Sequence, residues 1–409
     1  MESIETQIDR FFNPQNVAII GASRHPGHIG HVIIEQMVQA KYSGRLYLIN
    51  PEAAKKGIHI LGIKTYASLV DCGGPIDLAI IAVPAKIVPT VMKDCVEKEV
   101  KNIIIVSGGF RETGPDGEKL EEQVSSIAKK NNIRILGPNC LGTFSPKSNI
   151  DTLFLPSRTT PRPKAGRIAF LTQSGSVGGA VLSFAYNEGI GISRFASFGN
   201  ASDIDEGDLI DYLEDDTETT VTGLYLESVS RGRKFIDICR RASKVKPFVV
   251  IKAGRSEAGT RAVSSHTGSL AGTDRIYDAA FEAAGAIRVK TIGEFFDVAL
   301  ALANQPPAKG DRIAIITSGG GFGIMTLDAL DDYGLKAPEL SEKLQKRLLE
   351  KLPYYYSVKN PVDLTGSATA EQFAFALNTL LDCDEVDGII LIPLFMTPLL
   401  DADQVSQLI

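Results

Sequence analysis

The chain has 409 residues, of which 44% are hydrophobic and 22% charged, with 38 glycines and no tryptophan, a composition typical of globular α/β proteins. Its length exceeds one ordinary hydrophobic core, so we expect roughly two to three domains. The formal net charge of -6 offers no basic face, and we therefore expect no binding to nucleic acid.

Cysteine usage and the N-terminal sequence bear on the cellular compartment. Five scattered cysteines form no CxxC motif and no cluster with zinc-ligand spacing, which indicates a reduced, cytoplasmic protein without a structural metal. The N-terminal MESIETQIDR lacks the basic region and apolar core of a signal peptide. No apolar run approaches the roughly 20 residues that span a bilayer, so we expect no membrane insertion.

Short apolar runs alternate with helical patterns in the first third of the chain. Strands are expected at 16–23, 45–51, 78–84, 102–110 and 133–139, and helices at 29–40, 86–97 and 118–130. This alternation predicts a doubly wound parallel sheet. The expected strands end in glycine, proline, serine or asparagine, so their carboxyl ends form a rim of loops where a ligand can bind.

The first of these loops differs from that of a nicotinamide-dependent enzyme. GASRHPGHIG does not match GxGxxG, and the second strand ends in INP at 49–51, without the acidic residue that would bind a ribose hydroxyl. A nicotinamide oxidoreductase is therefore disfavoured. Gly21, Gly27 and Gly30 still allow a phosphate to approach the backbone, although they also fit ordinary tight turns.

Five loop motifs follow one another in this region: GAS…IGH, INP, AVP, SGGFRETG and GPNCLG. The set resembles the CoA-binding domain of the succinyl-CoA synthetase α-subunit and of the NDP-forming acyl-CoA synthetases. The resemblance implies a CoA-binding Rossmann-like domain over residues 1–150. It places the CoA phosphates at Gly21, Ala22, Ser23 and Gly30, the adenine and pantetheine at Val83, Pro84, Ser107 and Gly108, and the thiol end at Asn139 and Cys140, with Asn50 in the same site.

Two residues of these motifs also have simpler interpretations. Cys140 alone is more often a buried hydrophobic residue than a reactive thiol, and we do not expect it to be a nucleophile. Glu112 is more often a solvated loop charge than a catalytic group.

The middle of the chain repeats the α/β pattern. Residues 152–166 carry three prolines without helical periodicity, and they are the expected linker. Beyond it, strands are expected at 167–173, 192–199, 222–228 and 247–254, and helices near 177–188, 205–213 and 231–242. This order predicts a second parallel sheet.

Three polar motifs follow strands of this second expected sheet. QSGS, at 173–176, places serines and a glycine at a helix start, where backbone N–H groups form an anion site, but helix capping alone would also select serine. Glu227 ends a strand, where it could accept the ring N–H of a histidine or form a salt bridge with Arg231 or Arg233.

The third motif, SSHTGSLAG at 264–272, places His266 in an expected loop of small and hydroxyl residues. A neutral imidazole is a competent nucleophile near neutral pH because the unperturbed pKa of histidine is about 6.5, although His266 could also be a turn residue bonded to the backbone. Since the carboxyl ends of parallel strands meet at one edge of a sheet, the anion site, the carboxylate and the nucleophile can converge.

The order of QSGS, strand-end glutamate and SHTGSLAG resembles the ligase domain of the same synthetases, in which the histidine is phosphorylated and a glutamate supports it. The resemblance implies a flavodoxin-like ligase domain over 165–304. It makes His266 the phosphohistidine and Glu227 its partner. The phosphate would be held by Gln173, Ser174, Gly175, Ser176, Thr267 and Gly268.

A proline-containing linker at 304–311 precedes a third α/β domain at 311–409, which opens with a strand, a glycine loop (SGGGFG) and a helix. The glycine loop lacks the GK[ST] of a P-loop and is weak evidence for a nucleotide. NPVDLTGSA and GIILIPLF resemble the second flavodoxin-like ligase domain of the acyl-CoA synthetases. Because the sequence ends at DADQVSQLI, this domain is expected to be incomplete, as in a truncated chain, a fragment or a short subunit.

No stretch resembles the ATP-grasp module with which this family binds the adenine nucleotide and magnesium. The resemblance therefore implies an acid–thiol ligase α-subunit or fragment that interconverts acyl-CoA, phosphate and ADP with a small carboxylic acid, CoA and ATP. ADP or ATP and Mg would bind to an ATP-grasp β-subunit or a further C-terminal domain, and the protein would be an oligomer. The alternative is a CoA-sensing regulatory module without ligase activity, but a sensor has no need of the histidine beside QSGS and Glu227.

Overall fold

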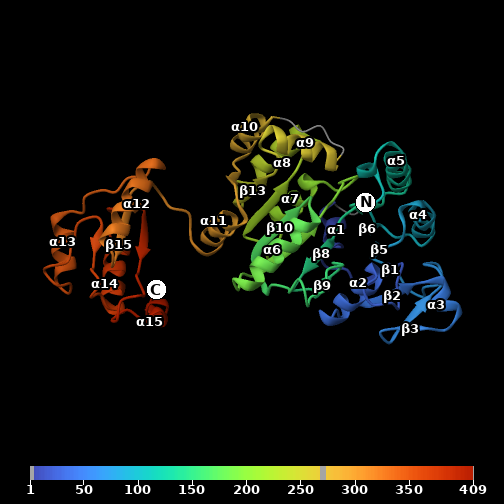
Figure 1. Ribbon diagram of the computed structural model, residues 1–409, viewed down its shortest axis with the longest axis horizontal. Coiled ribbons are helices and arrows are strands. Elements are labelled where there is room, and N and C mark those ends of the chain that lie inside the picture. Colours follow the sequence, from blue (N-terminus) through green and yellow to red (C-terminus); the bar gives the residue numbers. More distant parts are fainter. Residues whose placement is uncertain (1–3, 268–272, 409) are drawn as a thin grey trace. The chain divides into compact units, whose positions relative to one another are not determined.

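The computed structural model describes residues 4–267 and 273–408. The chain forms two compact units, residues 1–305 and 306–409, which are coloured blue to gold and orange to red in Figure 1. Both units are built from helices and mainly parallel strands, which confirms the predicted α/β fold class. Within the described residues, no helix combines the length and apolar character needed to cross a membrane.

The first sheet has the strand order β3-β4-β2-β1-β5-β6-β7, and all its pairs are parallel except β3–β4. Its strands are β1 (Asn16–Ile20), β2 (Arg45–Ile49), β3 (His59–Ile60), β4 (Ile63–Tyr66), β5 (Leu78–Ile81), β6 (Asn102–Ile105) and β7 (Arg134–Leu136). The helices are α2 (Ile29–Gln39), α3 (Pro51–Lys55), α4 (Val88–Glu97) and α5 (Pro115–Lys130). The doubly wound sheet is therefore confirmed. Helix α5 begins earlier than predicted because proline fits the first helical position.

Alternate residues of β1 show why its sequence is apolar throughout. Val17 and Ile19 pack in a core with α2, whereas Ala18 and Ile20 pack in a second core with α4 and α5. Successive side chains of a strand point to opposite faces, so a parallel strand covered by helices on both faces needs apolar residues at every position.

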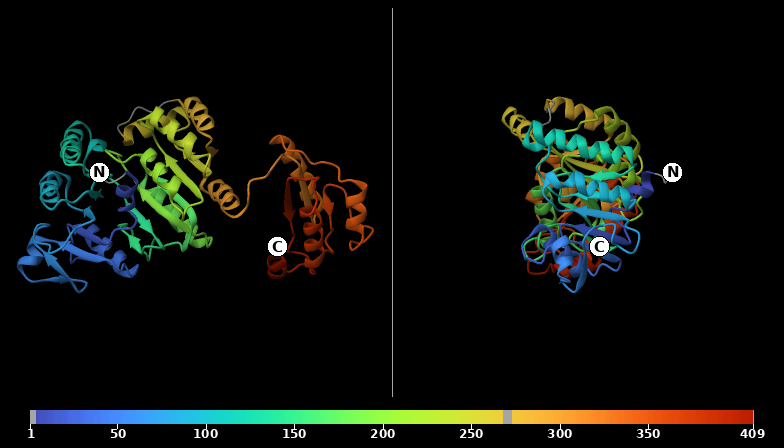
Figure 2. Two further views of the ribbon diagram at one scale, coloured as in Figure 1. Left: turned by 180° about the vertical axis from the view of Figure 1, so that it is seen from behind. Right: turned by 90° about the vertical axis from the view of Figure 1, so that its right-hand side faces the viewer.

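The second sheet has the order β14-β13-β12-β10-β11-β8-β9, with β8 antiparallel to β11 and to β9. Its strands are β8 (Gly142–Ser145), β9 (Ile150–Asp151), β10 (Ala165–Thr172), β11 (Ile192–Ser197), β12 (Val221–Leu226), β13 (Phe248–Lys252) and β14 (Ile287–Val289). The helices are α6 (Gly175–Asn187), α7 (Glu206–Asp215), α8 (Gly232–Ala242), α9 (Glu257–Thr267), α10 (Asp274–Ala284) and α11 (Ile292–Asn304). One face packs against α6 and α11 and the other against α7, α8 and α10 (Figures 1 and 2).

The two sheets of the first unit are joined more closely than a simple linker would allow. Strands β8 and β9, which directly follow the first sheet in the chain, pair into the second sheet. One apolar core contains Ile19 of the first sheet together with Leu171 and Phe248 of the second. In the expected linker, Arg162 forms an ion pair with Asp151 of β9 (2.7 Å). The two sheets therefore form one compact unit.

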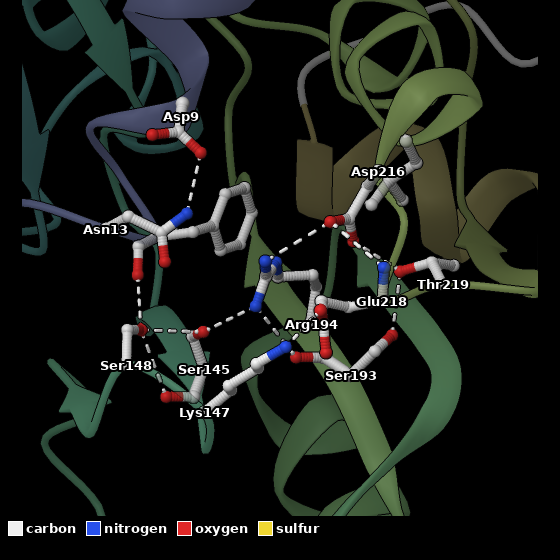
Figure 3. A network of polar contacts seen from close by, with 12 residues as sticks. Asp9, Asn13, Ser145, Lys147, Ser148, Ser193, Arg194, Asp216, Glu218 and Thr219 are labelled. Carbon is white, nitrogen blue, oxygen red and sulfur yellow. Dashed lines mark hydrogen bonds and ion pairs between the residues drawn. The ribbon is translucent and has the colours of Figure 1, made fainter.

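A buried polar network around Arg194 of β11 ties the N-terminal segment to the second sheet (Figure 3). Arg194 Nη2 pairs with Asp216 Oδ1 at 3.2 Å, and the two side chains are only 5% and 6% exposed. Arg194 Nη1 donates to Ser145 Oγ of β8 (2.8 Å), and the guanidinium lies 5.9 Å from the centre of the Phe12 ring. A cavity of about 410 Å³ adjoins the network. Because Arg194 lies near the start of β11, this cavity is at the amino end of the parallel strands, where α/β proteins do not usually bind ligands.

The second unit contains a parallel sheet of order β16-β15-β17. Its elements are β15 (Ile313–Thr317), α12 (Gly320–Asp332), α13 (Glu342–Leu349), β16 (Val362–Asp363), α14 (Ala370–Leu381), β17 (Gly388–Ile392) and α15 (Ala402–Leu408). The predicted strand and helix are confirmed, but most of the SGGGFG segment is not a loop. Residues 320–323 form the first turn of α12, and only Ser318 and the N-cap Gly319 separate this helix from the end of β15.

Candidate functional site

Each sheet of the first unit has a switch point, where consecutive connections leave a strand in opposite directions. In the first sheet, β1 lies between β2 and β5, and in the second, β10 lies between β11 and β12. Ligands of open α/β sheets bind outside the carboxyl ends of the strands at such points. The predicted CoA loops follow β1 and β5, and QSGS and Glu227 follow β10 and β12. Both predicted sites therefore lie where this fold class binds ligands.

The loop after β1 is shaped by two glycines. Gly21 has φ +89°, and a Cβ at this position would overlap the carbonyl oxygen of Ala82. A Cβ on Gly30, in the first turn of α2, would overlap the carbonyl oxygen of Gly21. These close approaches bring the loop against the N-terminus of α2, where backbone N–H groups can bind an anion. Ala22 and Gly30 are buried and Ser23 is half-buried.

Other predicted CoA residues hold the loops in place. Asn50 donates through Nδ2 to the Ala22 carbonyl (2.7 Å) and accepts from the Ala53 N–H through Oδ1 (2.9 Å), so it caps α3 and fixes the β1 loop. Ser107 Oγ donates to the Val83 carbonyl (2.5 Å). These polar groups bind backbone rather than facing a ligand freely. Pro84 and Gly108 are exposed, and Val83 is half-buried.

Asn139 and Cys140 differ in accessibility although they are neighbours in the chain. Asn139 is exposed, whereas Cys140 is only 3% exposed and its thiol contacts the Ile105 carbonyl (3.4 Å). Burial raises the pKa of the Cys140 thiol to about 12. A thiol in this state is a poor nucleophile, which agrees with the prediction that Cys140 is a packing residue.

A small polar cavity brings the two predicted sites together. Its lining comes from the loops after β6, β7, β10, β11 and β12, and consists of Arg111, Asn139, Gln173, Gly199, Asn200, Glu227 and Ser228. The resemblance assigns Asn139 to the thiol end of CoA, Gln173 to the phosphate and Glu227 to the support of His266. The structure thus places two side chains from the CoA motifs, Arg111 and Asn139, in the same cavity as two from the ligase motifs.

Gln173 holds the loop that carries Glu227. Its Oε1 accepts from the backbone N–H groups of Glu227 and Ser228, the latter at 3.0 Å, and its Nε2 donates to the Ser228 carbonyl (2.8 Å). The amide is therefore used by the backbone. In this geometry Gln173 positions the backbone at Glu227 and Ser228, and its contact with a phosphate stays a prediction.

The remaining QSGS residues combine both interpretations of the motif. Ser174 is the N-cap of α6, and its Oγ accepts from the Val177 N–H (3.4 Å) and lies 3.1 Å from Ser176 Oγ. Gly175 and Ser176 form the first turn of the helix, where N–H groups have no partner within the helix and can bind an anion. Ser174 therefore caps α6, and the N–H groups of Gly175 and Ser176 are the ones that can bind an anion.

Three residues in or near the cavity, Asn200, Glu112 and Arg111, were not predicted from the sequence as part of the site. Asn200 Nδ2 donates to Glu112 Oε2 (2.7 Å) and to Glu121 Oε2 (2.9 Å). Burial alone would raise the pKa of Glu112, but hydrogen bonds from Asn200 and from the N–H groups of Gly109 and Phe110 lower it. Glu112 is therefore a half-buried, hydrogen-bonded carboxylate, and its interpretation as a solvated loop charge is wrong.

Arg111 is the cation of the cavity. Its Nη2 donates to the Asn200 carbonyl and its Nη1 lies 3.6 Å from Glu121 Oε1. Its buried Nε has no hydrogen-bond partner among the described residues. A guanidinium in this position can balance negative charge on a bound group. Arg111 belongs to the SGGFRETG motif, so the motif could have indicated in the sequence that Arg111 lies at the site.

Glu227 is 7% exposed at the end of β12, and Lys252 is 3% exposed at the end of the neighbouring β13. Burial lowers the pKa of Lys252 to about 8, although the charge of Glu227 acts in the opposite direction. Arg231, one of the two possible salt-bridge partners of Glu227, forms its ion pair with Asp205 instead (3.1 Å).

The histidine motif is only partly within the described residues. Ser264, Ser265, His266 and Thr267 form the last turn of α9, so the expected loop does not include these residues. Gly268 lies outside the described residues, as do the side chains of His266 and Thr267. The prediction that His266 is the nucleophile therefore stays a prediction.

The fold and the site define a class of protein, the CoA ligases related to succinyl-CoA synthetase. Residues 15–146 match a family model described as a CoA binding domain, and residues 165–302 match a succinyl-CoA ligase like flavodoxin domain. The chain is 40% identical over 402 residues to the acetate–CoA ligase (ADP-forming) I subunit alpha of Pyrococcus furiosus, which covers 98% of this chain and 86% of that protein. The corresponding II subunit alpha is 40% identical over 396 residues, covering 96% and 84%.

The fold is similar to a solved structure of acetyl-coenzyme A synthetase 1 of Ca. Korarchaeum cryptofilum, in complex with phosphate and ADP. The TM-score is 0.91 at 35% identity, with 98% of this chain and 84% of that chain covered. The chain belongs to the ADP-forming acyl-CoA synthetases, a family of acid–thiol ligases, and it corresponds to their alpha subunits. The alternative of a regulatory CoA sensor is not favoured.

Proposed function

We propose that this chain is the CoA-binding, phosphohistidine-bearing subunit of an ADP-forming acyl-CoA synthetase. The observation that carries the proposal is the polar cavity, where Asn139 of a CoA motif lies with Gln173 and Glu227 of the ligase motifs. A thioester bound from the CoA side would meet a phosphate bound at the start of α6. Arg111 and the N–H groups of Gly175 and Ser176 would stabilise the charge on the phosphate.

The reaction would proceed in two transfers on this subunit. A phosphate oxygen attacks the thioester carbon, the carbon–sulfur bond breaks, and CoA leaves as a thiolate that takes up a proton. A ring nitrogen of His266 then attacks the phosphorus of the acyl phosphate, and the carboxylate leaves. Glu227 would accept the other ring N–H, which fixes the tautomer and stabilises the positive ring. Positioning and charge stabilisation supply most of the rate enhancement in such transfers.

ADP would receive the phosphoryl group on a partner. We assign ADP or ATP and Mg to an ATP-grasp β-subunit or a further domain, in an oligomeric enzyme that works on a small carboxylic acid in the cytoplasm. Support for a partner comes from the relatives, which are named as alpha subunits. Reduced cysteines fit the compartment, since Cys72, Cys95, Cys140, Cys239 and Cys383 are all free.

The test is phosphate labelling of the chain coexpressed with its candidate ATP-grasp partner. Incubation with acyl-CoA and radiolabelled phosphate is expected to give an acid-labile, base-stable label on this chain. The His266→Ala variant is expected to lose the label, and a matched His59→Ala variant, at an exposed position, is expected to keep it. Equal labelling of wild type and His266→Ala would contradict the proposal.

A further inference from the structure

A second cavity, of about 470 Å³, lies along α6. Its walls include Leu141, Phe154 and Leu155, and α6 contributes Gly179, Ala180 and Ser183. Its volume falls in the range of small-molecule sites. Most of its lining residues lie outside the motifs discussed above.

The cavity begins where the phosphate is proposed to bind. Gly175 and Ser176 belong to its lining and also form the first turn of α6. Leu141 follows Asn139 by two residues, and Gly175 follows Gln173 by two residues, whereas Asn139 and Gln173 line the polar cavity. The same two chain segments therefore border both cavities, one polar and one largely apolar.

Bonding in the substrate connects the two cavities. The carbon that phosphate attacks carries the CoA sulfur on one side and the acyl chain on the other. If the CoA sulfur lies near Asn139 and the phosphate binds at Ser176, the reacting carbon lies between them. The acyl chain, which is bonded to that carbon, then lies next to the start of α6. We propose that the α6 cavity holds this acyl chain, an assignment that rests on the function proposed above.

The lining also indicates the class of acid. The described residues of the cavity include no charged side chain; besides the apolar groups, they offer hydroxyls from Thr160, Ser176 and Ser183. A second carboxylate on the acid would lose its hydration without finding a cation there, which is costly. An apolar chain would instead cover Phe154 and Leu155, which are half-buried. The cavity therefore selects apolar monocarboxylic acids larger than acetate over dicarboxylic acids.

Ala180 provides a way to fill the cavity without disturbing the helix. It is an exposed residue of α6 that lines the cavity, and leucine has nearly the same helix propensity as alanine. Gly179 is less suitable, because a Cβ there would already lie 3.0 Å from Leu155 Cδ1. Asn187→Leu is the matched control, since Asn187 is an exposed residue of the same helix outside the cavity.

The experiment compares kcat/KM for isovalerate, phenylacetate, acetate and succinate in the complex with the partner subunit. Wild type is expected to prefer isovalerate to succinate. Ala180→Leu is expected to lower the isovalerate-to-acetate ratio of kcat/KM by roughly tenfold or more, and Asn187→Leu to keep it. Leu155→Ala, which enlarges the cavity, is expected to raise the phenylacetate-to-acetate ratio.

The outcomes separate this inference from the proposed function. Ligase activity with unchanged acid ratios in both Ala180→Leu and Leu155→Ala would overturn the acyl assignment and leave the proposed function standing. A preference of wild type for succinate would also overturn it. Absence of CoA thioester formation from every acid, acetate included, would overturn the proposed function itself.

Discussion

Replacing Glu227 by glutamine is expected to slow phosphorylation of His266 by roughly 10²- to 10⁴-fold. Glutamine matches the size of glutamate, and Gln173 binds the backbone N–H of residue 227, so the loop after β12 is expected to keep its shape. The change removes the negative charge that would stabilise the positively charged ring, and an amide can also select the wrong ring tautomer. The expected loss of rate therefore concerns the transfer of the phosphoryl group to His266.

Rapid quenching of a single turnover with acyl-CoA and radiolabelled phosphate measures this step directly. Glu188→Gln is the matched control because Glu188 is exposed just beyond α6, and it is expected to react like wild type. CoA affinity, measured by calorimetry, is expected to be the same in both variants. The expected slowing is at least roughly hundredfold. A phosphorylation rate of Glu227→Gln within about threefold of the wild-type rate would therefore exclude Glu227 from the mechanism.

The parts of the fold that could be predicted are those in which the sequence pattern is local. Strands such as β5 and β6 are buried at every position, and helices on both faces require this of a parallel strand. Because parallel strands share a carboxyl edge, the positions of Gln173 and Glu227 on one edge of the second sheet followed from their places after strands. Asn139 follows β7 of the first sheet, and its meeting with these two residues in one cavity was not predicted.

The features that could not be predicted depend on distant partners. Strands β8 and β9 are short and carry polar residues, and β8 is ordered by antiparallel pairing with β11. Asn200 and Arg111 meet across 89 positions of the chain, so no local pattern marks Asn200 as part of the site. In α9, the serines before His266 suggested a loop, but helix continues through Thr267.

Replacing Arg194 by methionine is expected to lower the free energy of unfolding of the first unit by about 3–5 kcal/mol, the cost of removing one partner of a buried ion pair. Asp216, 6% exposed, would keep Thr219 as a hydrogen-bond donor (2.7 Å) but lose its cation. Ser145 Oγ would lose the Arg194 donor and keep the one from Ser148 Oγ (2.8 Å). Methionine fills much of the same space, so the loss reports on charge and hydrogen bonding rather than on a cavity.

Urea unfolding followed by circular dichroism measures the change, with Arg241→Met as the control. Arg241 also contacts acidic side chains, but it is 53% exposed, and such pairs contribute roughly 0–1 kcal/mol. The double variant Arg194→Met/Asp216→Leu is expected to regain much of the lost stability, because no buried charge is left unpaired. Equal, small losses in Arg194→Met and Arg241→Met would show that the network in Figure 3 does not hold the N-terminal segment and the second sheet together.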